Sequence, residues 1–175
     1  MKTLVIGLGN PILGDDGVGW KVAEEVRKRL ADSKWQIADG SDPSAAGRQS
    51  PAIEVDCASL GGLSLMERLT GYNRVILIDA IFTGQKPIGS ITTFPLSTLP
   101  DPTAGHTASA HDTSLRTALH VGHKMSVPLP ADDDITVVAI EAQNVYDFSQ
   151  ELSQPVAAAL PMAVEAVLEL LKQEK

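Results

Sequence analysis

Cysteine is nearly absent from this sequence: Cys57 is the single one among 175 residues. A lone cysteine excludes a disulfide within the chain, and disulfides are typical of secreted proteins. The first residues lead directly into a strand-like segment, without the charged and apolar regions of a signal peptide. We therefore expect the protein to be cytoplasmic.

Positive charge and long apolar runs are also scarce. The chain has 14 Lys and Arg against 22 Asp and Glu, a formal net charge of -8. Nucleic acids and anionic membrane surfaces bind proteins through basic surfaces, so neither is an expected partner. Asp, Asn or Pro interrupts every apolar run before it approaches the roughly 20 residues that cross a bilayer. The sequence thus predicts a protein that contacts neither nucleic acid nor membrane.

Hydrophobic patterning predicts a single α/β domain over residues 1–175. The apolar content of 43% is enough for one sizeable core. Short aliphatic runs, typical of buried strands, alternate with segments in which apolar residues recur at helical spacing. This alternation predicts a mainly parallel sheet of about five strands, covered by helices on both faces. The expected strands are Thr3–Gly7, Pro51–Cys57, Arg74–Ala80, Ile88–Phe94 and Ile135–Ile140, and the expected helices begin near Asp16, Leu63, Asp112 and Ser153.

Composition also predicts two long loops. The stretch Ala31–Ser50 is rich in Asp, Gly, Ser and Pro, and only Trp35 and Ile37 indicate a brief strand within it. The stretch Pro95–Ala110 is rich in Pro and Thr. Long loops in compact domains are often functional, so the second one draws attention to the residues that follow it.

A glycine-rich turn, Gly7–Ile12, follows the first expected strand. It begins like a dinucleotide-binding fingerprint, but Ile12 occupies the position of the third glycine. Asp15 and Asp16 then stand at the helix start, where a pyrophosphate would need backbone donors and would meet two carboxylates. We therefore exclude nucleotide binding at this turn. One aspartate is expected to cap the helix, and the other is a candidate cation ligand, because nearby glycines leave room for an approach.

Two further residues join this candidate site. Asp79 ends the most hydrophobic expected strand, at the edge where open α/β sheets bind ligands; its alternative is a structural, loop-bonding role. His111 ends the second long loop, directly before Asp112, the expected helix cap; its alternative is an ordinary solvated histidine. Two carboxylates and one imidazole form a workable metal-binding set with open coordination positions. The candidate site is therefore Asp16, Asp79 and His111.

Other chemically reactive groups receive weaker interpretations. Cys57 with His111 is a candidate nucleophile and base, although a lone cysteine in an α/β core more often packs inertly. Glu141 and Gln143 follow a buried strand and are candidates to line the same cleft as Asp79. The sequence has neither the serine-hydrolase elbow nor the zincin helix. Groups that fit a solvated surface better than a site are His120, His123 and Asp132–Asp134.

Four segments together resemble the hydrogenase maturation endopeptidases. The stretch Gly7–Gly19 is similar to the opening signature of that family, and Ile76–Ala80, Ser109–Asp112 and Leu152–Val156 continue the resemblance in order and spacing. It covers nearly the whole chain. The resemblance implies a three-layer α/β fold and an endopeptidase that removes the C-terminal extension of a nickel-iron hydrogenase large-subunit precursor after nickel insertion.

The resemblance also implies the site and its metal. In that family an acidic residue after the glycine turn, an aspartate ending the central strand and a histidine on a later loop contact the metal. These positions match Asp16, Asp79 and His111, which are the expected catalytic and metal-contacting residues. Nickel is then carried by the substrate precursor, and the protein holds no tightly bound organic cofactor of its own. We expect a monomer.

Two other functions stay open at this stage. A non-catalytic nickel-binding or scaffold protein would use the same three ligands and leave its partner uncut. A cysteine hydrolase would depend on Cys57 and His111 instead. The lack of a recognisable nucleophile fits the scaffold as well as it fits metal-assisted hydrolysis, and the family resemblance favours the enzyme.

Overall fold

In the computed structural model, residues 1–32, 52–99 and 110–173 are described, of which 52 and 110–114 by their backbone alone. Five strands in these ranges form one sheet in the order β2-β1-β3-β5-β4. Only β4 runs antiparallel to its neighbour, and it lies at one edge. The expected mainly parallel sheet of five strands is confirmed. The strands are β1 (Lys2–Leu8), β2 (Ala52–Ala58), β3 (Arg74–Ile81), β4 (Ile91–Pro95) and β5 (Ile135–Glu141).

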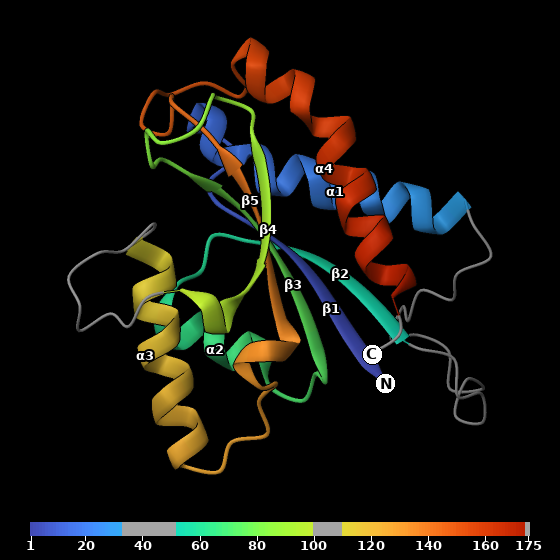
Figure 1. The fold of residues 1–175 in the computed structure, drawn as a ribbon, viewed down its shortest axis with the longest axis vertical. Coiled ribbons are helices and arrows are strands. Elements are labelled where there is room, and N and C mark those ends of the chain that lie inside the picture. The colour runs from blue at the N-terminus through green and yellow to red at the C-terminus, as the bar shows by residue number, and fades with distance from the viewer. Residues whose placement is uncertain (33–51, 100–109, 174–175) are drawn as a thin grey trace.

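Helices cover both faces of the sheet and make three layers (Figure 1). Helices α1 and α4 pack together on one face, and α2 and α3 pack together on the other. The three-layer α/β architecture predicted from the sequence is thus confirmed. The helices are α1 (Val18–Asp32), α2 (Gly62–Leu69), α3 (Ala110–Lys124) and α4 (Gln154–Lys172), with short 3-10 turns η1 (Gly14–Gly17), η3 (Leu96–Thr98) and η5 (Asp132–Asp134).

Side-chain alternation along the central strands divides the interior into two cores. Leu77 of β3 packs in the core under α2 and α3, and Ile78, the next residue, packs in the core under α1 and α4. Burial on both faces explains why β3 reads as a continuous aliphatic run. On α1 the apolar residues at a spacing of four, Val18, Val22, Val26 and Leu30, are all buried, as their periodicity predicts.

Two element boundaries differ from expectation. Helix α3 begins at Ala110, so Asp112 lies inside its first turn and is not its N-cap. Strand β4 begins at Ile91, three residues later than predicted, because a turn closed by the Ser90 N–H and the Pro87 carbonyl at 3.0 Å occupies the start of the expected strand. The loop residues 33–51 and 100–109, including the brief strand expected near Trp35 and Ile37, lie outside the described residues.

Helix α4 is long and apolar enough, by length and composition, to cross a membrane. Pro161 interrupts the apolar run of this helix. In this fold one side of the helix covers the sheet, with Val156, Ala163 and Val167 fully buried in the core shared with α1. A helix that covers a sheet in this way is the outer layer of an α/β protein.

Candidate active site

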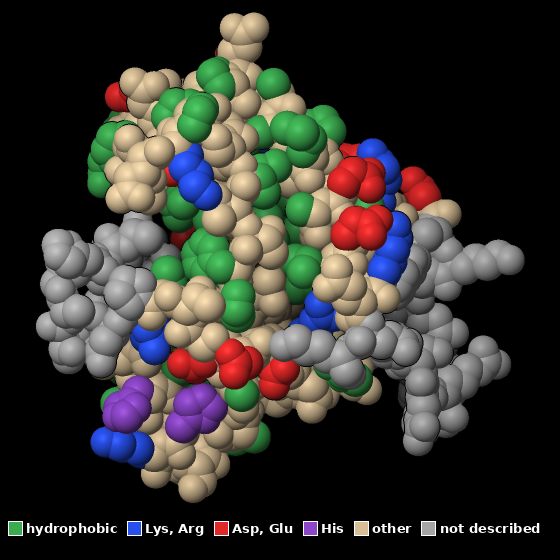
Figure 2. All heavy atoms as spheres, viewed as in Figure 1, with side chains coloured by type: hydrophobic (Ala, Val, Ile, Leu, Met, Phe, Trp, Pro, Cys, Tyr) green, Lys and Arg blue, Asp and Glu red, His purple; other side chains and the backbone are tan. Residues whose placement is uncertain are grey.

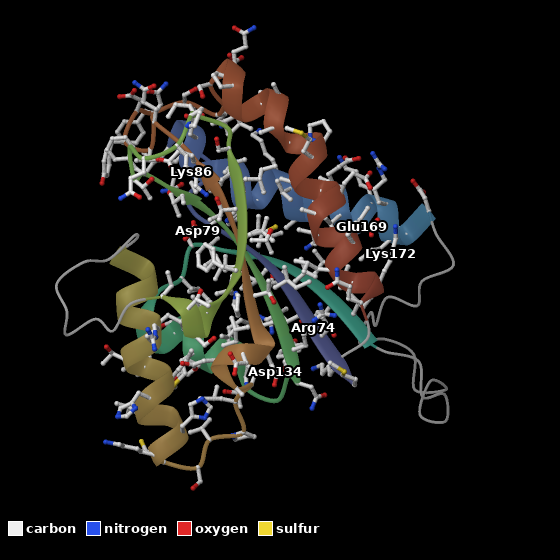
Figure 3. All side chains as sticks on the ribbon, in the orientation of Figure 1. Arg74, Asp79, Lys86, Asp134, Glu169 and Lys172 are labelled. Atoms are coloured by element: carbon white, nitrogen blue, oxygen red, sulfur yellow. The ribbon has the colours of Figure 1, made fainter. Side chains whose placement is uncertain are left out.

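Asp79 lies near the carboxyl end of the central strand, where the parallel strands β1, β3 and β5 all end. Its neighbour across the sheet is Ala139 of β5. Only 3% of Asp79 is exposed. In Figure 3 its side chain projects from the sheet on the side of α3, in agreement with Leu77 and Ile81, which share its face. The structure thus puts this aspartate at the carboxyl ends of the parallel strands, where sheets of this kind bind ligands.

Asp16 is held in place by the glycine-rich turn that precedes it. Gly9 adopts a φ of +113°, and a Cβ built there would lie 1.9 Å from the Asp16 carbonyl oxygen, so only glycine fits. This close approach lets the Asn10 N–H donate to Asp16 Oδ2 at 2.6 Å. No described residue donates a hydrogen bond to Asp16 Oδ1. One carboxylate oxygen is therefore fixed by the backbone and the other is available to a ligand.

A second glycine contact brings the Asp16 turn next to the end of β3. A Cβ on Gly19, in the first turn of α1, would lie 2.3 Å from the Leu8 carbonyl oxygen and 2.5 Å from that of Ile78. The helix start therefore packs directly on the last residue of β1 and on Ile78 of β3, the residue before Asp79, and η1, which carries Asp16, contacts β3. Asp16 and Asp79 come from neighbouring elements at one edge of the sheet.

His111 lies in the first turn of α3, and its side chain is outside the described residues. Figure 1 shows that α3 starts near the carboxyl ends of the strands and runs toward their amino ends. The helix also packs on the face of the sheet that carries Asp79, through Leu115 and Leu119. The backbone of His111 thus lies at the same end of the strands as Asp79 and on the same face of the sheet.

Asp15 has a different role from its neighbour Asp16. Its side chain is fully buried, with 0% exposed. Oδ1 accepts a hydrogen bond from the Ser153 N–H at 2.7 Å, and Oδ2 accepts from the Ser153 hydroxyl at 2.9 Å and the Asn144 N–H at 3.2 Å. Of the two aspartates, Asp15 is therefore the structural one. It does not cap its own helix, as the sequence predicted for one of the pair, but ties η1 to the start of α4.

Glu141 is also a structural carboxylate. It is fully buried at the end of β5, and its Oε1 accepts from the N–H groups of Thr83 and Gly84 at 2.7 and 2.8 Å. Its Oε2 accepts from the Thr83 hydroxyl at 2.7 Å. The expectation that Glu141 lines the cleft is wrong, because both oxygens hold the loop after β3. Gln143 is exposed just beyond it.

Cys57 faces away from the Asp79 side of the sheet. Its side chain packs with the core under α1 and α4, and its Sγ lies 3.8 Å from the Trp20 carbonyl oxygen. Helix α3, which carries His111, covers the opposite face. Burial raises the pKa of the Cys57 thiol, which disfavours the nucleophilic thiolate. The arrangement therefore opposes a Cys57–His111 pair.

The remaining acidic and histidine groups give no second metal centre in the described part of the chain. Among the described side chains, which do not include that of His111, no three of His, Cys, Asp or Glu are placed to hold an ion. His120 and His123 are exposed, and His123 lies 4.0 Å from Asp132 on η5, at the far end of α3. These residues form a solvated surface, as their sequence pattern indicates.

A match to a known protein family identifies the family of this chain. A family model described as hydrogenase maturation protease matches residues 52–170, which is more than half of the chain. The protein belongs to the hydrogenase maturation protease family. The resemblance found in the sequence is thereby confirmed, and the matched range contains Asp79 and His111 but begins after Asp15 and Asp16.

Individual members of the hydrogenase maturation protease family are distant in sequence but alike in fold. The hydrogenase expression/formation protein HupD of Rhizobium leguminosarum is 23% identical over 171 residues, which cover 98% of this chain and 74% of HupD. The hydrogenase maturating endopeptidase HybD from E. coli superposes with a TM-score of 0.71 at 20% identity, covering 98% of this chain and 93% of HybD. For the NiFe hydrogenase maturation protease HybD from Thermococcus kodakarensis the TM-score is 0.65 at 21% identity, covering 97% of this chain and 99% of that protein.

Proposed function

We propose that this protein is the endopeptidase that removes the C-terminal extension from the large-subunit precursor of a nickel-iron hydrogenase after nickel insertion, acting in the cytoplasm as a monomer. The observation that carries the proposal is that Asp16 and Asp79, from two separate elements, lie at one sheet edge in a chain of the hydrogenase maturation protease family. The names of the relatives support it, since one of them is called a NiFe hydrogenase maturation protease.

In this proposal Asp16, Asp79 and His111 contact the nickel that the precursor already holds. Asp16 contributes Oδ1, because the Asn10 N–H fixes Oδ2 and so orients the carboxylate. Asp79 contributes a carboxylate from the rigid central strand, and His111 an imidazole from the first turn of α3. Oxygen and imidazole ligands suit a first-row divalent ion. Docking of the precursor then depends on correct metallation, so nickel acts as the tag for a finished subunit.

Cleavage in this proposal is metal-assisted peptide hydrolysis. A Lewis-acidic ion beside the scissile peptide polarises its carbonyl or lowers the pKa of a bound water. A carboxylate of the site then acts as the general base that takes the proton of the attacking water. The protein supplies the positioned carboxylates, and the substrate supplies the ion.

A cleavage assay tests the proposal. Nickel-loaded and nickel-free large-subunit precursors are incubated with the enzyme, and mass spectrometry of the C-terminus detects the cut. We expect wild type to trim only the loaded precursor and Asp16→Ala to trim neither. A matched control is Asp32→Ala, which removes an exposed carboxylate at the other end of α1. This variant should cleave like wild type.

Two outcomes contradict the proposal. Binding of loaded precursor without any cleavage identifies the non-catalytic scaffold. Equal trimming of loaded and nickel-free precursor shows that the enzyme reads the polypeptide and not the metal.

A further inference from the structure

Four apolar side chains are exposed at the loops around the candidate active site. They are Ile12, Phe82, Tyr146 and Phe148, exposed by 46%, 60%, 85% and 86%. We call this set the apolar rim. Three of the seven aromatic residues of the chain belong to it. Figure 2 shows hydrophobic side chains gathered over the loops that follow β3 and β5, at upper left. The fold makes no use of these rings as core.

Backbone hydrogen bonds hold the three loops of the apolar rim together. The Ser149 N–H, next to Phe148, donates to the Ile12 carbonyl oxygen at 3.1 Å. The Ala142 N–H, at the start of the loop that carries Tyr146, donates to the Ile81 carbonyl oxygen at 2.7 Å, directly before Phe82. The loops that carry the four side chains are therefore joined in pairs at the carboxyl ends of the strands, although they come from distant parts of the sequence.

The apolar rim adjoins the Asp16 turn through Asp15. Asp15 accepts from the Asn144 N–H at the root of the Tyr146 loop, and its own N–H donates to the Asn144 carbonyl oxygen at 2.9 Å. The Gly14 N–H donates to the Ser149 carbonyl oxygen at 2.7 Å, on the other side of Phe148. The turn that carries Asp16 and the loop that carries the two aromatic rings are thus one hydrogen-bonded unit.

The charges beside the rings indicate the chemistry of a partner. Asp147 lies between Tyr146 and Phe148, and Glu151 follows shortly after; both are exposed. The Phe82 loop carries the opposite charge, since Lys86 on it is also exposed and its Nζ donates to Thr92 Oγ1 at 2.6 Å (Figure 3). Neither forms an ion pair with another residue of the described ranges. A polypeptide with apolar side chains flanked by Lys or Arg complements the loop of Tyr146 and Phe148, whereas an acidic segment is repelled by that loop and by the net charge of -8.

We infer that the apolar rim is the docking surface for the hydrogenase large-subunit precursor, through an apolar segment with neighbouring basic residues that lies beside the cleavage point. The inference rests on the proposed function. A polypeptide held with its scissile bond near Asp16 and Asp79 lies over this edge. Exposed aromatic side chains at such a place are typical of the few residues that carry most of the binding free energy of an interface.

A binding assay between immobilised nickel-loaded precursor and the enzyme tests the docking surface, with KM of cleavage as a second readout. We expect Tyr146→Ser/Phe148→Ser to weaken binding roughly tenfold or more and to raise KM in parallel. Folding is not at risk, because both rings are almost fully exposed. The conservative exchange Tyr146→Phe/Phe148→Tyr should bind like wild type, and Asp147→Lys should weaken binding.

The matched control is Val121→Ser/Met125→Ser, which removes two exposed apolar side chains, 42% and 72% exposed, at the far end of α3. It should bind like wild type. Cleavage by wild type together with undiminished binding by Tyr146→Ser/Phe148→Ser overturns the inference alone. If wild type binds the precursor without cleaving it, and the double variant loses this binding, the proposed function is overturned and the docking surface is supported. Absence of wild-type binding overturns both. Concentration-dependent dimerisation that the double variant abolishes assigns the rim to a second copy and overturns the inference.

Discussion

Asp15 and Ser153, 138 positions apart in the chain, are joined by two hydrogen bonds to the two oxygens of one buried carboxylate. The bonds measure 2.7 Å from the Ser153 N–H to Oδ1 and 2.9 Å from its hydroxyl to Oδ2. Ser153 is the N-cap of α4, and Asp15 belongs to the turn η1 that carries Asp16. A structural carboxylate therefore fixes the position of its neighbour Asp16, the proposed metal ligand, relative to α4.

Replacement of Asp15 by Ala should destabilise the protein strongly. It leaves the Ser153 and Asn144 N–H groups without their buried acceptor, which costs roughly 2–4 kcal/mol of the free energy of unfolding. Urea denaturation of wild type and variant measures the difference. Asp147→Ala, which removes an exposed acid from the nearby loop, is the control and should change stability by less than about 0.5 kcal/mol. A difference that small for Asp15→Ala would show that the buried hydrogen bonds contribute little.

Gly9→Ala should damage both stability and cleavage. Gly9 and Gly71 both have positive φ values, +113° and +83°. A Cβ on Gly9 lies 1.9 Å from the Asp16 carbonyl oxygen, whereas a Cβ on Gly71 has open space within 4 Å. Gly71→Ala therefore pays only the backbone strain, about 1 kcal/mol. Gly9→Ala adds a collision and shifts Asp16, so it should lose more stability and most of the cleavage activity.

Thermal unfolding and precursor cleavage distinguish these two glycine variants. Equal losses for Gly9→Ala and Gly71→Ala would mean that the turn relaxes without moving Asp16. Cleavage that survives in Gly9→Ala at a reduced melting temperature would argue that the position of Asp16 does not limit the reaction.

Cys57→Ala should retain cleavage of the nickel-loaded precursor, and Asp79→Asn should lose it. Cys57 packs with the core on the α1 and α4 face, away from α3. Asp79→Asn replaces the carboxyl group near the end of β3 by an amide with little change in volume, and loss of a catalytic acid–base group lowers rates by roughly 100-fold or more. Rates at saturating precursor measure both variants. The reverse pattern, an inactive Cys57→Ala and an active Asp79→Asn, would establish the cysteine hydrolase.

The stability contributed by Glu54 should disappear in acid. Burial alone raises the pKa of this carboxyl, but hydrogen bonds from Tyr72 and Arg68 and the charges of Arg68 and Lys2 outweigh burial and lower it. A carboxyl with a lowered pKa in the folded state stabilises the protein above its unfolded pKa, near 4.3. That contribution is lost as the pH falls through the folded pKa.

Urea denaturation of Glu54→Gln checks this prediction. The variant should be less stable than wild type at pH 7, and the gap should close as the pH falls well below about 4. Glu67→Gln is the control, because Glu67 is exposed on the same side of the sheet, on α2, and forms no ion pair with the described residues. A gap independent of pH would mean that the Gln side chain loses packing and not charge.

Much of the fold was predictable because local patterns and tertiary burial agree here. Aliphatic runs mark β1, β3 and β5, and each is buried on both faces. The spacing of four between apolar residues marks α1. The start of α3 was less predictable, since Asp112 is a strong capping residue by type yet lies inside the first turn. Propensity for a cap is a local preference, and tertiary packing selects the helix start.

The candidate site was predictable in part. Asp79 and Asp16 stand out locally, one at the end of a hydrophobic strand and the other beside glycines. No local sequence feature distinguishes the role of Asp16 from that of Asp15, or shows that Glu141 is structural and does not line a cleft. Their roles depend on donors brought from distant segments, Ser153 for Asp15 and Thr83 for Glu141. A buried carboxylate needs such donors, and no sequence pattern names them.

The sequence by itself determined the α/β class, the alternation of elements and the family resemblance, and it named the candidate metal ligands, because each depends on residue type and near-neighbour spacing. Only the tertiary structure decided which carboxylates are structural, on which face Cys57 lies, and that the rings of Phe82, Tyr146 and Phe148 share one exposed edge. Those properties depend on register, burial and contacts between segments far apart in the chain, which one-dimensional patterns do not contain.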